Sequence, residues 1–304
     1  MVIAVIDLGT NTSNLVVASL RDQDVKILYQ GKEYVRLGDR KIAENILSEA
    51  ALARAYAAVS RQVRNARKWG AGNIRIIATS AVRQAVNRNE LTNAIIESEG
   101  IAVEVIDGDR EADLIYQGVR LALGTLPEPT VILDIGGGSN EVIIIEDSII
   151  HWRFSFASGM SRIISKFPIS DPITLDEINI LENHYLEVHQ EAIDLCHQFG
   201  VKTLIGCSGA FNTLADILDG TEPEEAFRKR KDISLEQFNN VYQQIIRSTT
   251  SERVAMKGMD MVRTELIVPA LILTNTLIRN TGIEKIVQTG YSLREGVLRE
   301  MTKH

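Results

Sequence analysis

Apolar and polar residues follow nearly the same pattern in two distant stretches of the chain. The first reads VIAVIDLGTNTSNLVV around Asp7, and the second reads TVILDIGGGSNEVIII around Asp134. Each is an apolar, β-branched run, then Asp-x-Gly with small polar residues, then another apolar run, which predicts a strand, a tight turn and a strand. The repetition indicates two related lobes, each offering one glycine-rich turn to a shared cleft.

Between the two hairpins, the pattern predicts a sheet covered by helices. Apolar positions recur at helical spacing after Ser48, a residue that suits a helix N-terminus, and the pattern ends near Gly70. Another helix opens near Gly108, in GDREADLIYQGV, and we expect it to bridge the lobes. The other elements predicted in this half are strands at 2–7, 14–20, 25–29, 74–79 and 103–106 and a helix at 89–97.

After the second hairpin the pattern becomes mainly helical. The strands in KTLIGCSG and EKIVQTG each end in glycine and lead into a helix, which places functional backbone at the carboxyl end of a strand. The charged stretch DGTEPEEAFRKRKD is expected to be a solvated loop. Helices are predicted at 158–166, 174–199, 208–218, 235–249 and 258–279, and a third hairpin strand in SIIHWRFSF.

Composition describes a globular protein and narrows what it can bind. With 304 residues, 45% of them hydrophobic and 24% charged, the chain suits two domains with separate cores. The net charge of −7 argues against sequence-independent nucleic-acid binding, which needs a basic surface. Cys196 and Cys207 lack the spacing of a disulfide framework or zinc site. Neither a basic leader nor an apolar run of membrane-spanning length is found, so we expect a cytoplasmic location and no membrane partner.

The two glycine-rich turns are suited to binding phosphate. Glycine lets the backbone approach a ligand closely, so main-chain N–H groups in each turn can point at anionic oxygens. The aspartates that open the turns, Asp7 and Asp134, then suit a magnesium ion or the positioning of a water molecule. Their simpler interpretation is a turn-forming role. The phosphate-binding candidates in the turns are Gly9, Thr10, Asn11, Gly136, Gly137, Gly138 and Ser139.

Five motifs together resemble the exopolyphosphatase and guanosine pentaphosphatase family. They span 5–298 and are the paired Asp-Gly hairpins, ATSAVRQA, the GDREADLIYQGV helix start, LIGCSGAFNTLADI and YSLREGV. The resemblance implies two ribonuclease-H-like α/β lobes around an interdomain cleft, as in actin, sugar kinases and heat-shock ATPases. We place the first lobe at 1–117 and the second at 118–289, and we expect 290–304 to pack back on the first.

The resemblance also implies chemical roles for four residues. The family's catalytic glutamate falls on Glu111, where a carboxylate at a cleft-facing helix start can accept a proton from water attacking a terminal phosphorus. The family's acidic residues around the second turn fall on Asp134 and Glu141, which suit magnesium, and Asp7 is a further metal candidate. Arg83 matches the arginine after the family's ATxxLR-type strand and would neutralise phosphate charge.

Three of these residues also have a structural explanation. Glu111 could simply favour the macrodipole of its helix. Glu141 stands beside apolar residues in a strand and could face solvent. Arg83 could lie on the surface of a helix.

The strand end at GCSGA is interpreted as a third glycine turn. It does not meet the serine-hydrolase motif GxSxG, because Ala210 replaces the second glycine. Ala210 also stands where the family commonly has threonine. Further departures are Arg110, in place of a family glutamate, and Asp39-Arg40-Lys41, where the family has another glycine-containing turn. Backbone binding of phosphate or nucleotide is assigned to Gly206, Ser208 and Gly209.

The predicted function is magnesium-dependent release of terminal orthophosphate from inorganic polyphosphate, by water that Glu111 activates. Hydrolysis of the 5′-terminal phosphate of guanosine pentaphosphate is the alternative within the family. A non-catalytic polyphosphate or nucleotide sensor is the alternative of another class, and a homodimer stays open. Because longer family members continue past the position of His304 into a helical extension, we expect short polyphosphate to be preferred and released between cuts.

Overall fold

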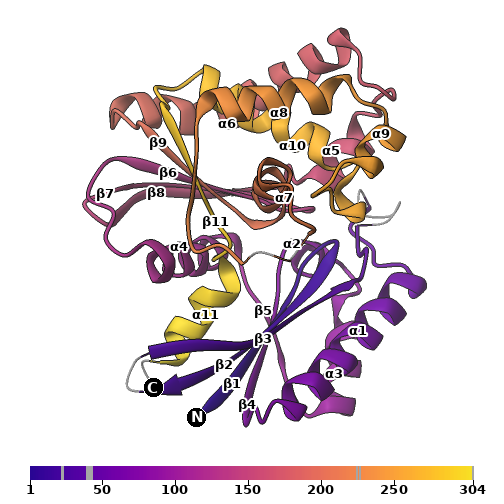
Figure 1. Ribbon diagram of the computed structural model, residues 1–304. Helices are drawn as coiled ribbons and strands as arrows, with labels where there is room; N and C mark the ends of the chain where they lie inside the picture. Colours follow the sequence, from indigo (N-terminus) through magenta and orange to yellow (C-terminus); the bar gives the residue numbers. More distant parts are fainter. Residues whose placement is uncertain (22–23, 39–43, 224, 226, 303–304) are drawn as a thin grey trace.

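The two halves of the chain form separate lobes, each built around one mixed β-sheet (Figure 1). The computed structural model describes every residue except 22–23, 39–43, 224, 226 and 303–304. The predicted α/β fold with two lobes is therefore confirmed. The departure predicted at Asp39-Arg40-Lys41 lies outside the described residues.

The first sheet is built from the strands β1 (Val2–Leu8), β2 (Thr12–Arg21), β3 (Asp24–Tyr34), β4 (Asn73–Ala78) and β5 (Val103–Val105). They lie in the order β3-β2-β1-β4-β5, with β1 antiparallel to β2 and parallel to β4. Ile6 and Leu8 pack on one face of the sheet and Ile3 and Val5 on the other. Because both faces are covered, β1 reads as a continuous apolar run rather than an alternating one.

Helices cover one face of this first sheet. They are α1 (Glu49–Lys68), α2 (Ser80–Gln84) and α3 (Arg88–Glu99). The start predicted at Ser48 is confirmed: its side chain accepts a hydrogen bond from the Ala51 amide at 3.2 Å and caps α1. Small residues such as Ala55 and Ala58 form the buried face of α1, so this helix packs closely on the sheet. Helix α2 was not predicted, because five residues are too few to show helical periodicity.

The second sheet contains the strands β6 (Thr130–Ile135), β7 (Asn140–Glu146), β8 (Ile149–Phe156), β9 (Thr203–Cys207), β10 (Lys231–Ile233) and β11 (Lys285–Thr289). Their order is β10-β11-β9-β6-β7-β8. Without β10, the order β8-β7-β6-β9-β11 repeats that of the first sheet, three antiparallel strands followed by two parallel ones. This is the ribonuclease-H-like topology, and it makes the hairpins β1-β2 and β6-β7 equivalent.

The helices of the second lobe are α5 (Met160–Lys166), α6 (Leu175–Gln198), α7 (Ser208–Asp219), α8 (Leu235–Arg247), α9 (Thr250–Ala255), the 3-10 turn η2 (Met261–Arg263) and α10 (Ile267–Arg279). The helix predicted at 258–279 is wrong in its first half. Gly258 has a φ of +88° and Asp260 is extended, so the chain makes η2 before α10 begins. Helix α9 and strand β10 were not predicted, since both are short and polar.

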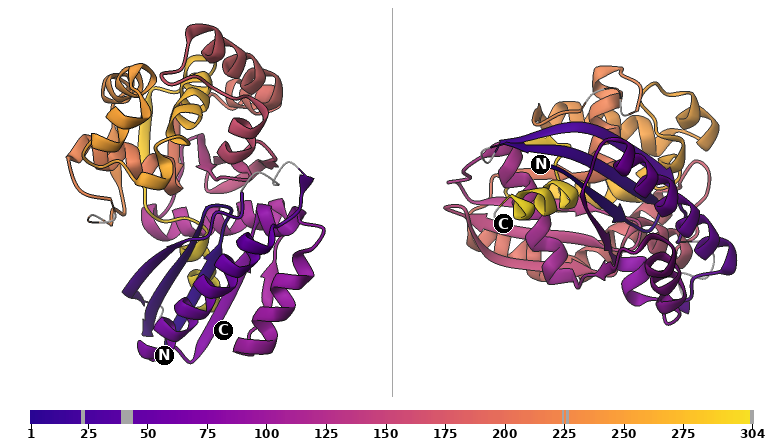
Figure 2. Two further views of the ribbon diagram at one scale, coloured as in Figure 1. Left: turned by 90° about the vertical axis from the view of Figure 1, so that its right-hand side faces the viewer. Right: turned by 90° about the horizontal axis from the view of Figure 1, so that it is seen from below.

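Two helices connect the lobes, α4 (Gly108–Leu123) and α11 (Leu293–Met301). Helix α11 packs against α4 and against β1, so the C-terminal segment returns to the first lobe (Figure 2). The two helix backbones touch: a Cβ at Gly118 would overlap the Ser292 carbonyl, and one at Gly296 would overlap the Leu114 carbonyl. The boundary predicted between 117 and 118 falls inside α4.

Within the described residues, no helix is both long enough and apolar enough to cross a membrane.

Candidate active site

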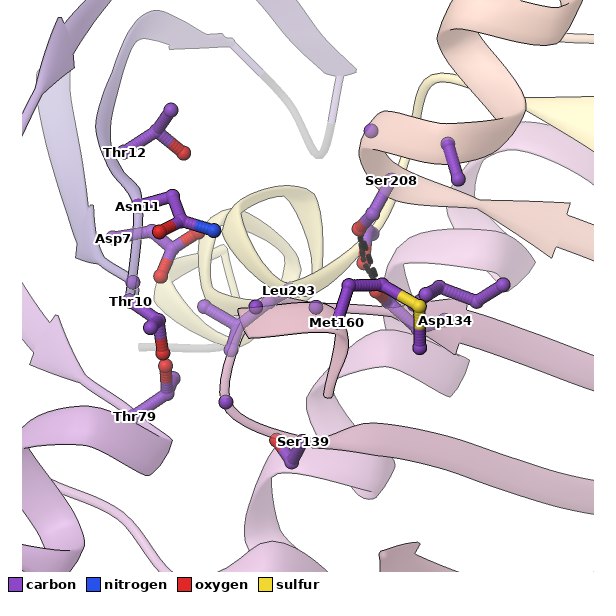
Figure 3. Close-up of a pocket in the computed structure, with 18 of the residues that line it drawn as sticks. Asp7, Thr10, Asn11, Thr12, Thr79, Asp134, Ser139, Met160, Ser208 and Leu293 are labelled. Atoms are coloured by element: carbon purple, nitrogen blue, oxygen red, sulfur yellow. Dashed lines mark hydrogen bonds between the residues drawn. The ribbon is translucent and has the colours of Figure 1, made fainter. Parts of the chain in front are cut away.

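A cavity of about 180 Å³ lies between the lobes and is lined by residues from both. The carboxyl ends of β1 and β6 meet at this cavity, because the two hairpins point toward one another across the cleft. Asp7, Thr10 and Asn11 stand on one side of it, and Asp134, Ser139 and Ser208 on the other (Figure 3). The fold therefore brings together the two repeated sequence motifs, which are far apart in the chain.

The turn of the first hairpin is closed by its own backbone. The amide of Gly9 donates to the Thr12 carbonyl at 3.0 Å. In the second hairpin, the Gly136 amide donates to the Ser139 carbonyl at the same distance. These two amides therefore stabilise the turns, and the next residues of each turn are the better placed to meet an anion.

The two turns touch each other across the cleft. A Cβ at Gly137 would overlap the Asn11 side chain, and one at Gly138 would overlap Thr10 and Ser80. Glycine at both positions lets these side chains approach the turn closely, and a side chain at either position would require them to shift. The side chains of Asn11 and Ser161 also hydrogen-bond between the lobes at 3.0 Å.

Glu111 lies in the first turn of α4 and reaches the cavity from its base. Its side chain is buried, at 6% exposed, and its Oε2 accepts a hydrogen bond from Nη1 of Arg83 at 2.7 Å. Burial, together with the charges of Asp134 and Asp7, raises the pKa of Glu111 to about 7, against the lowering effect of Arg83. A carboxyl that ionises near neutral pH beside a cavity has the properties of a general base.

Asp134 ends β6 and is held by hydroxyl groups from two other segments. Its Oδ2 accepts hydrogen bonds from Ser208, at 2.6 Å, and from Ser292. Burial raises its pKa, while these hydroxyl donors act in the opposite direction. Glu141 faces Asp134 on the neighbouring strand and accepts from Ser155 at 2.7 Å. Burial, Glu111 and Asp134 together raise the pKa of Glu141 well above its ordinary value.

Asp7, which is partly buried, is the fourth carboxyl group that lines the cavity, beside the buried Glu111, Asp134 and Glu141. Burial raises its pKa to about 7, while Arg294 lowers it and Asp134 raises it. These carboxyl groups repel one another when they are ionised, and a bound cation would reduce this repulsion. Among the described residues, however, no set of three Asp, Glu, His or Cys side chains is arranged to hold a metal alone. The donors fit Mg²⁺, which is commonly held by one or two carboxylates with water and substrate phosphate completing its shell.

Most of the predicted site residues line the cavity, but Arg83 and Gly206 do not. Arg83 does not line the cavity, and its guanidinium bonds both Glu111 and, at 3.0 Å, the Ile106 carbonyl. Gly206 packs under Phe211, whose ring a Cβ would overlap. Its position is therefore explained by packing in the core. The solvent-facing interpretation of Glu141 is wrong, because its side chain is buried in the cleft.

Other residues of the cavity were not predicted from the sequence. Arg263, in η2, packs its guanidinium against Gly209. The positive charge of Arg294, in α11, lowers the pKa of Asp7. Ser292 stands in YSLREGV directly after a strand that ends in glycine, and that position could have indicated it. No local pattern marks Arg263, since the tertiary fold alone brings η2 to the first turn of α7.

Several basic residues that do not line the cavity form ion pairs within the protein. Arg110 bonds Glu300 at 2.6 Å and therefore points along the α4-α11 contact rather than into the cleft. In the loop before β10, Arg228 bonds Asp216 and Asp219, and Lys231 also bonds Asp219. Ala210, at the position of a family threonine, lines the cavity and offers no hydroxyl.

The duplicated hairpins and the acidic cleft between them define a two-lobed α/β protein of ribonuclease-H-like topology. The chain belongs to the Ppx/GppA phosphatase family, whose family model matches residues 16–304. The resemblance found in the sequence motifs is thereby confirmed.

Similar structures cover the whole chain. It is 34% identical to an exopolyphosphatase from Cytophaga hutchinsonii, with a TM-score of 0.95 over 100% of this chain and 98% of that one. An Aquifex aeolicus PPX-GPPA enzyme, 21% identical, shares the fold with a TM-score of 0.83 over 99% of each chain. An uncharacterised protein of Streptomyces coelicolor is 26% identical over 97% of this chain and 88% of its own length.

Proposed function

We propose that this protein releases terminal orthophosphate from inorganic polyphosphate, with Mg²⁺, through attack by water that Glu111 activates. The observation that carries this proposal is the pairing of Glu111 with Arg83 at the base of a cavity flanked by two glycine-rich turns. Similarity to the exopolyphosphatase of Cytophaga hutchinsonii supports the choice of substrate.

In this proposal the chain's own groups bind the substrate and move one proton. Backbone N–H groups of the turns, at Thr10, Asn11, Gly137 and Gly138, hold phosphate oxygens, and Arg263 supplies a guanidinium to the same cavity. Glu111 takes a proton from the attacking water, and the leaving phosphate chain departs in line with the attack. No covalent bond to the protein is formed. Dissociation of a proton from Glu111 restores the base.

Asp134, Glu141 and Asp7 are the residues that would hold Mg²⁺. When bound, the ion would neutralise phosphate charge that develops as the bond breaks. Hydroxyl donors from Ser208 and Ser292 fix the orientation of the Asp134 carboxylate.

Guanosine pentaphosphate is the second candidate substrate, and the apolar part of the cavity wall supports it. Beside the carboxylates, the cavity is lined by the apolar side chains of Val262, Leu266, Ile267 and Ala270. A nucleoside can use such a wall, whereas a polyphosphate chain has no apolar part to bury. The expected preference for short polyphosphate accords with the pairing of Arg110 and Arg228 within the protein.

The deciding experiment compares phosphate release from tripolyphosphate, long-chain polyphosphate and guanosine pentaphosphate, each with and without Mg²⁺. Glu111→Gln serves as the inactive control, which identifies any contaminating phosphatase. Release from polyphosphate that needs both Mg²⁺ and Glu111 supports the proposal. Preferred release from guanosine pentaphosphate selects the second candidate, and tight binding without release would make the protein a sensor.

A further inference from the structure

Lys32 of the first lobe forms an ion pair with Asp260 of the second, so the contact joins the two lobes. The Lys32 side chain is only 10% exposed and that of Asp260 only 3%, so the pair is shielded from water. Tyr34, two residues further along β3, donates its hydroxyl to the other carboxylate oxygen of Asp260 at 3.3 Å. The ammonium group of Lys32 also lies 5.1 Å from the centre of the Tyr34 ring.

Asp260 is bonded on its other side to the residues that follow it. Its Oδ1 caps η2 by accepting from the Val262 amide at 3.1 Å. Its Oδ2 lies 3.4 Å from Nη1 of Arg263, and Arg263 lines the cavity with its guanidinium against Gly209. One buried carboxylate therefore faces two cations, one from each lobe.

The charges account for the state of this carboxylate. Burial alone would raise the pKa of Asp260, but Arg263 and Lys32 together hold it below its ordinary value. Asp260 carries one negative charge and faces two cations, so it cannot neutralise both. Part of the positive charge of Arg263 is therefore left to act on an anion in the cavity.

We propose that Asp260 is a positioning residue that couples closure of the lobes to the placement of Arg263, through its contacts with Lys32 and Tyr34. When the lobes separate, Lys32 leaves and Arg263 becomes the sole cationic partner of Asp260 among these groups, which draws the guanidinium toward the carboxylate. When they close, Lys32 takes over part of the carboxylate's charge, and Arg263 is released toward an anionic ligand. This inference rests on the proposed function in one respect, that the ligand is a chain of phosphates.

The test is a double-mutant cycle of Lys32→Met and Arg263→Met, built in the Glu111→Gln background so that ligand is not consumed. The dissociation constant of tripolyphosphate is measured by calorimetry. We expect Lys32→Met to weaken binding roughly tenfold when Arg263 is present and less than about twofold when it is not. Equal effects in both backgrounds would overturn the coupling, because Lys32 would then act independently of Arg263.

The matched control is Lys26→Met, the same change at an exposed position of the same strand. It should leave the dissociation constant unchanged. Tyr34→Phe removes one hydrogen bond to Asp260 without changing charge, and it should weaken binding in the same direction with a smaller effect. If Tyr34→Phe and Lys32→Met both bind like the wild type, Asp260 does not need the first lobe, and the proposal fails.

A second readout does not depend on the substrate. Labels at Arg64→Cys on α1 and Glu187→Cys on α6, both at exposed positions, report the distance between the lobes. The two natural cysteines are buried, which favours labelling at the introduced sites. Lys32→Met should shift the distance distribution toward the longer values, and Lys26→Met should not. An unchanged distribution for Lys32→Met would overturn the role in closure, whereas a shift without any tripolyphosphate binding would refute the proposed function alone.

Discussion

Nη1 of Arg83 lies 2.7 Å from Oε2 of Glu111, and the two residues come from α2 and α4, on either side of β5 in the chain. The same Nη1 donates to the Ile106 carbonyl, directly after β5, so the guanidinium is fixed by the first lobe's backbone. The bond both orients the carboxylate toward the cavity and opposes the rise in its pKa that burial causes. In the proposed mechanism, Arg83 would therefore act through Glu111.

Replacing Glu111 by Gln should abolish turnover while keeping the fold and the binding of substrate. The amide preserves the shape of the side chain but cannot accept the proton, and loss of a general base typically costs about 10²- to 10⁴-fold in rate. Phosphate release from tripolyphosphate at saturating substrate measures the effect. Glu97→Gln, the same change at an exposed site on α3, should retain full activity. Activity of Glu111→Gln within about threefold of the wild type would remove Glu111 from the mechanism.

Replacing Arg83 by Met should move the pH dependence of the reaction toward alkaline pH. The guanidinium lowers the pKa of Glu111, so without it burial should raise this pKa above about 7. Because the base must be ionised, kcat/KM should then keep rising with pH up to the new, higher pKa and level off only above it. The profile of kcat/KM against pH checks this, with Arg64→Met at an exposed site as the control. A lower rate without any shift in the profile would show that Arg83 does not control the pKa of Glu111.

The sequence predicted much of this site because its residues belong to local patterns. The turns around Gly9 and Gly137 are visible as strand-turn-strand repeats, and Glu111 lies in the helix start that GDREADLIYQGV predicts. Arg263 could not be found in this way. Its relation to Gly209 depends on how the chain between α9 and α10 folds, and a helical pattern was wrongly extended through that segment.

The same distinction applies to the fold. The long helices and the hairpins were predicted, since periodicity over many residues outweighs local exceptions. Strand β10 was assigned to a loop because its charged residues pair with β11 only in the folded sheet. Gly206 was assigned to phosphate binding from its place in GCSGA, whereas the ring of Phe211 fills the space beside it. Tertiary packing decided these cases, and a single sequence does not display it.

Asp134→Asn and Glu141→Gln should raise the Mg²⁺ concentration needed for half-maximal activity. Each change replaces an anionic oxygen donor with a neutral amide, which a hard cation binds less well. Magnesium titrations of phosphate release check this, and Asp109→Asn, an exposed carboxylate of α4, is the matched control. If both variants follow the wild-type curve, the ion lies elsewhere, and Asp7 is the next residue to change.

His189 should make the protein less stable as the pH falls from 6.5 to about 4. The ring is buried between Tyr185 and Asn140, and burial lowers its pKa to about 4. In this range the unfolded chain binds a proton that the folded protein does not, so unfolding is favoured by up to about 3 kcal/mol. The raised pKa values of Asp7 and Glu111 act oppositely, giving stability at low pH that is lost as the pH rises through about 7.

The His189 contribution is isolated by comparison with His189→Gln, because the other groups titrate in both proteins. Denaturant unfolding at several pH values gives the free energy of each. The difference between wild type and variant should decrease toward acid, since only the wild type loses stability through this ring. A constant difference from pH 7 to pH 4 would contradict the prediction.

Gly118→Ala should lower both stability and activity, although residue 118 is remote from bound phosphate in the proposed mechanism. A Cβ at this position would overlap the Ser292 carbonyl, so the α4-α11 contact must open. Overpacking of this kind costs about 1–3 kcal/mol. Moving Ser292 also withdraws its hydroxyl from Asp134, which should raise the Mg²⁺ requirement. Thermal unfolding and magnesium titration measure the two effects.

Gly72→Ala is the matched control, since nothing lies within 4 Å of its Cβ position. If Gly118→Ala loses stability but keeps the wild-type Mg²⁺ requirement, the contact serves only to hold the helices together, and Ser292 does not link it to the cleft.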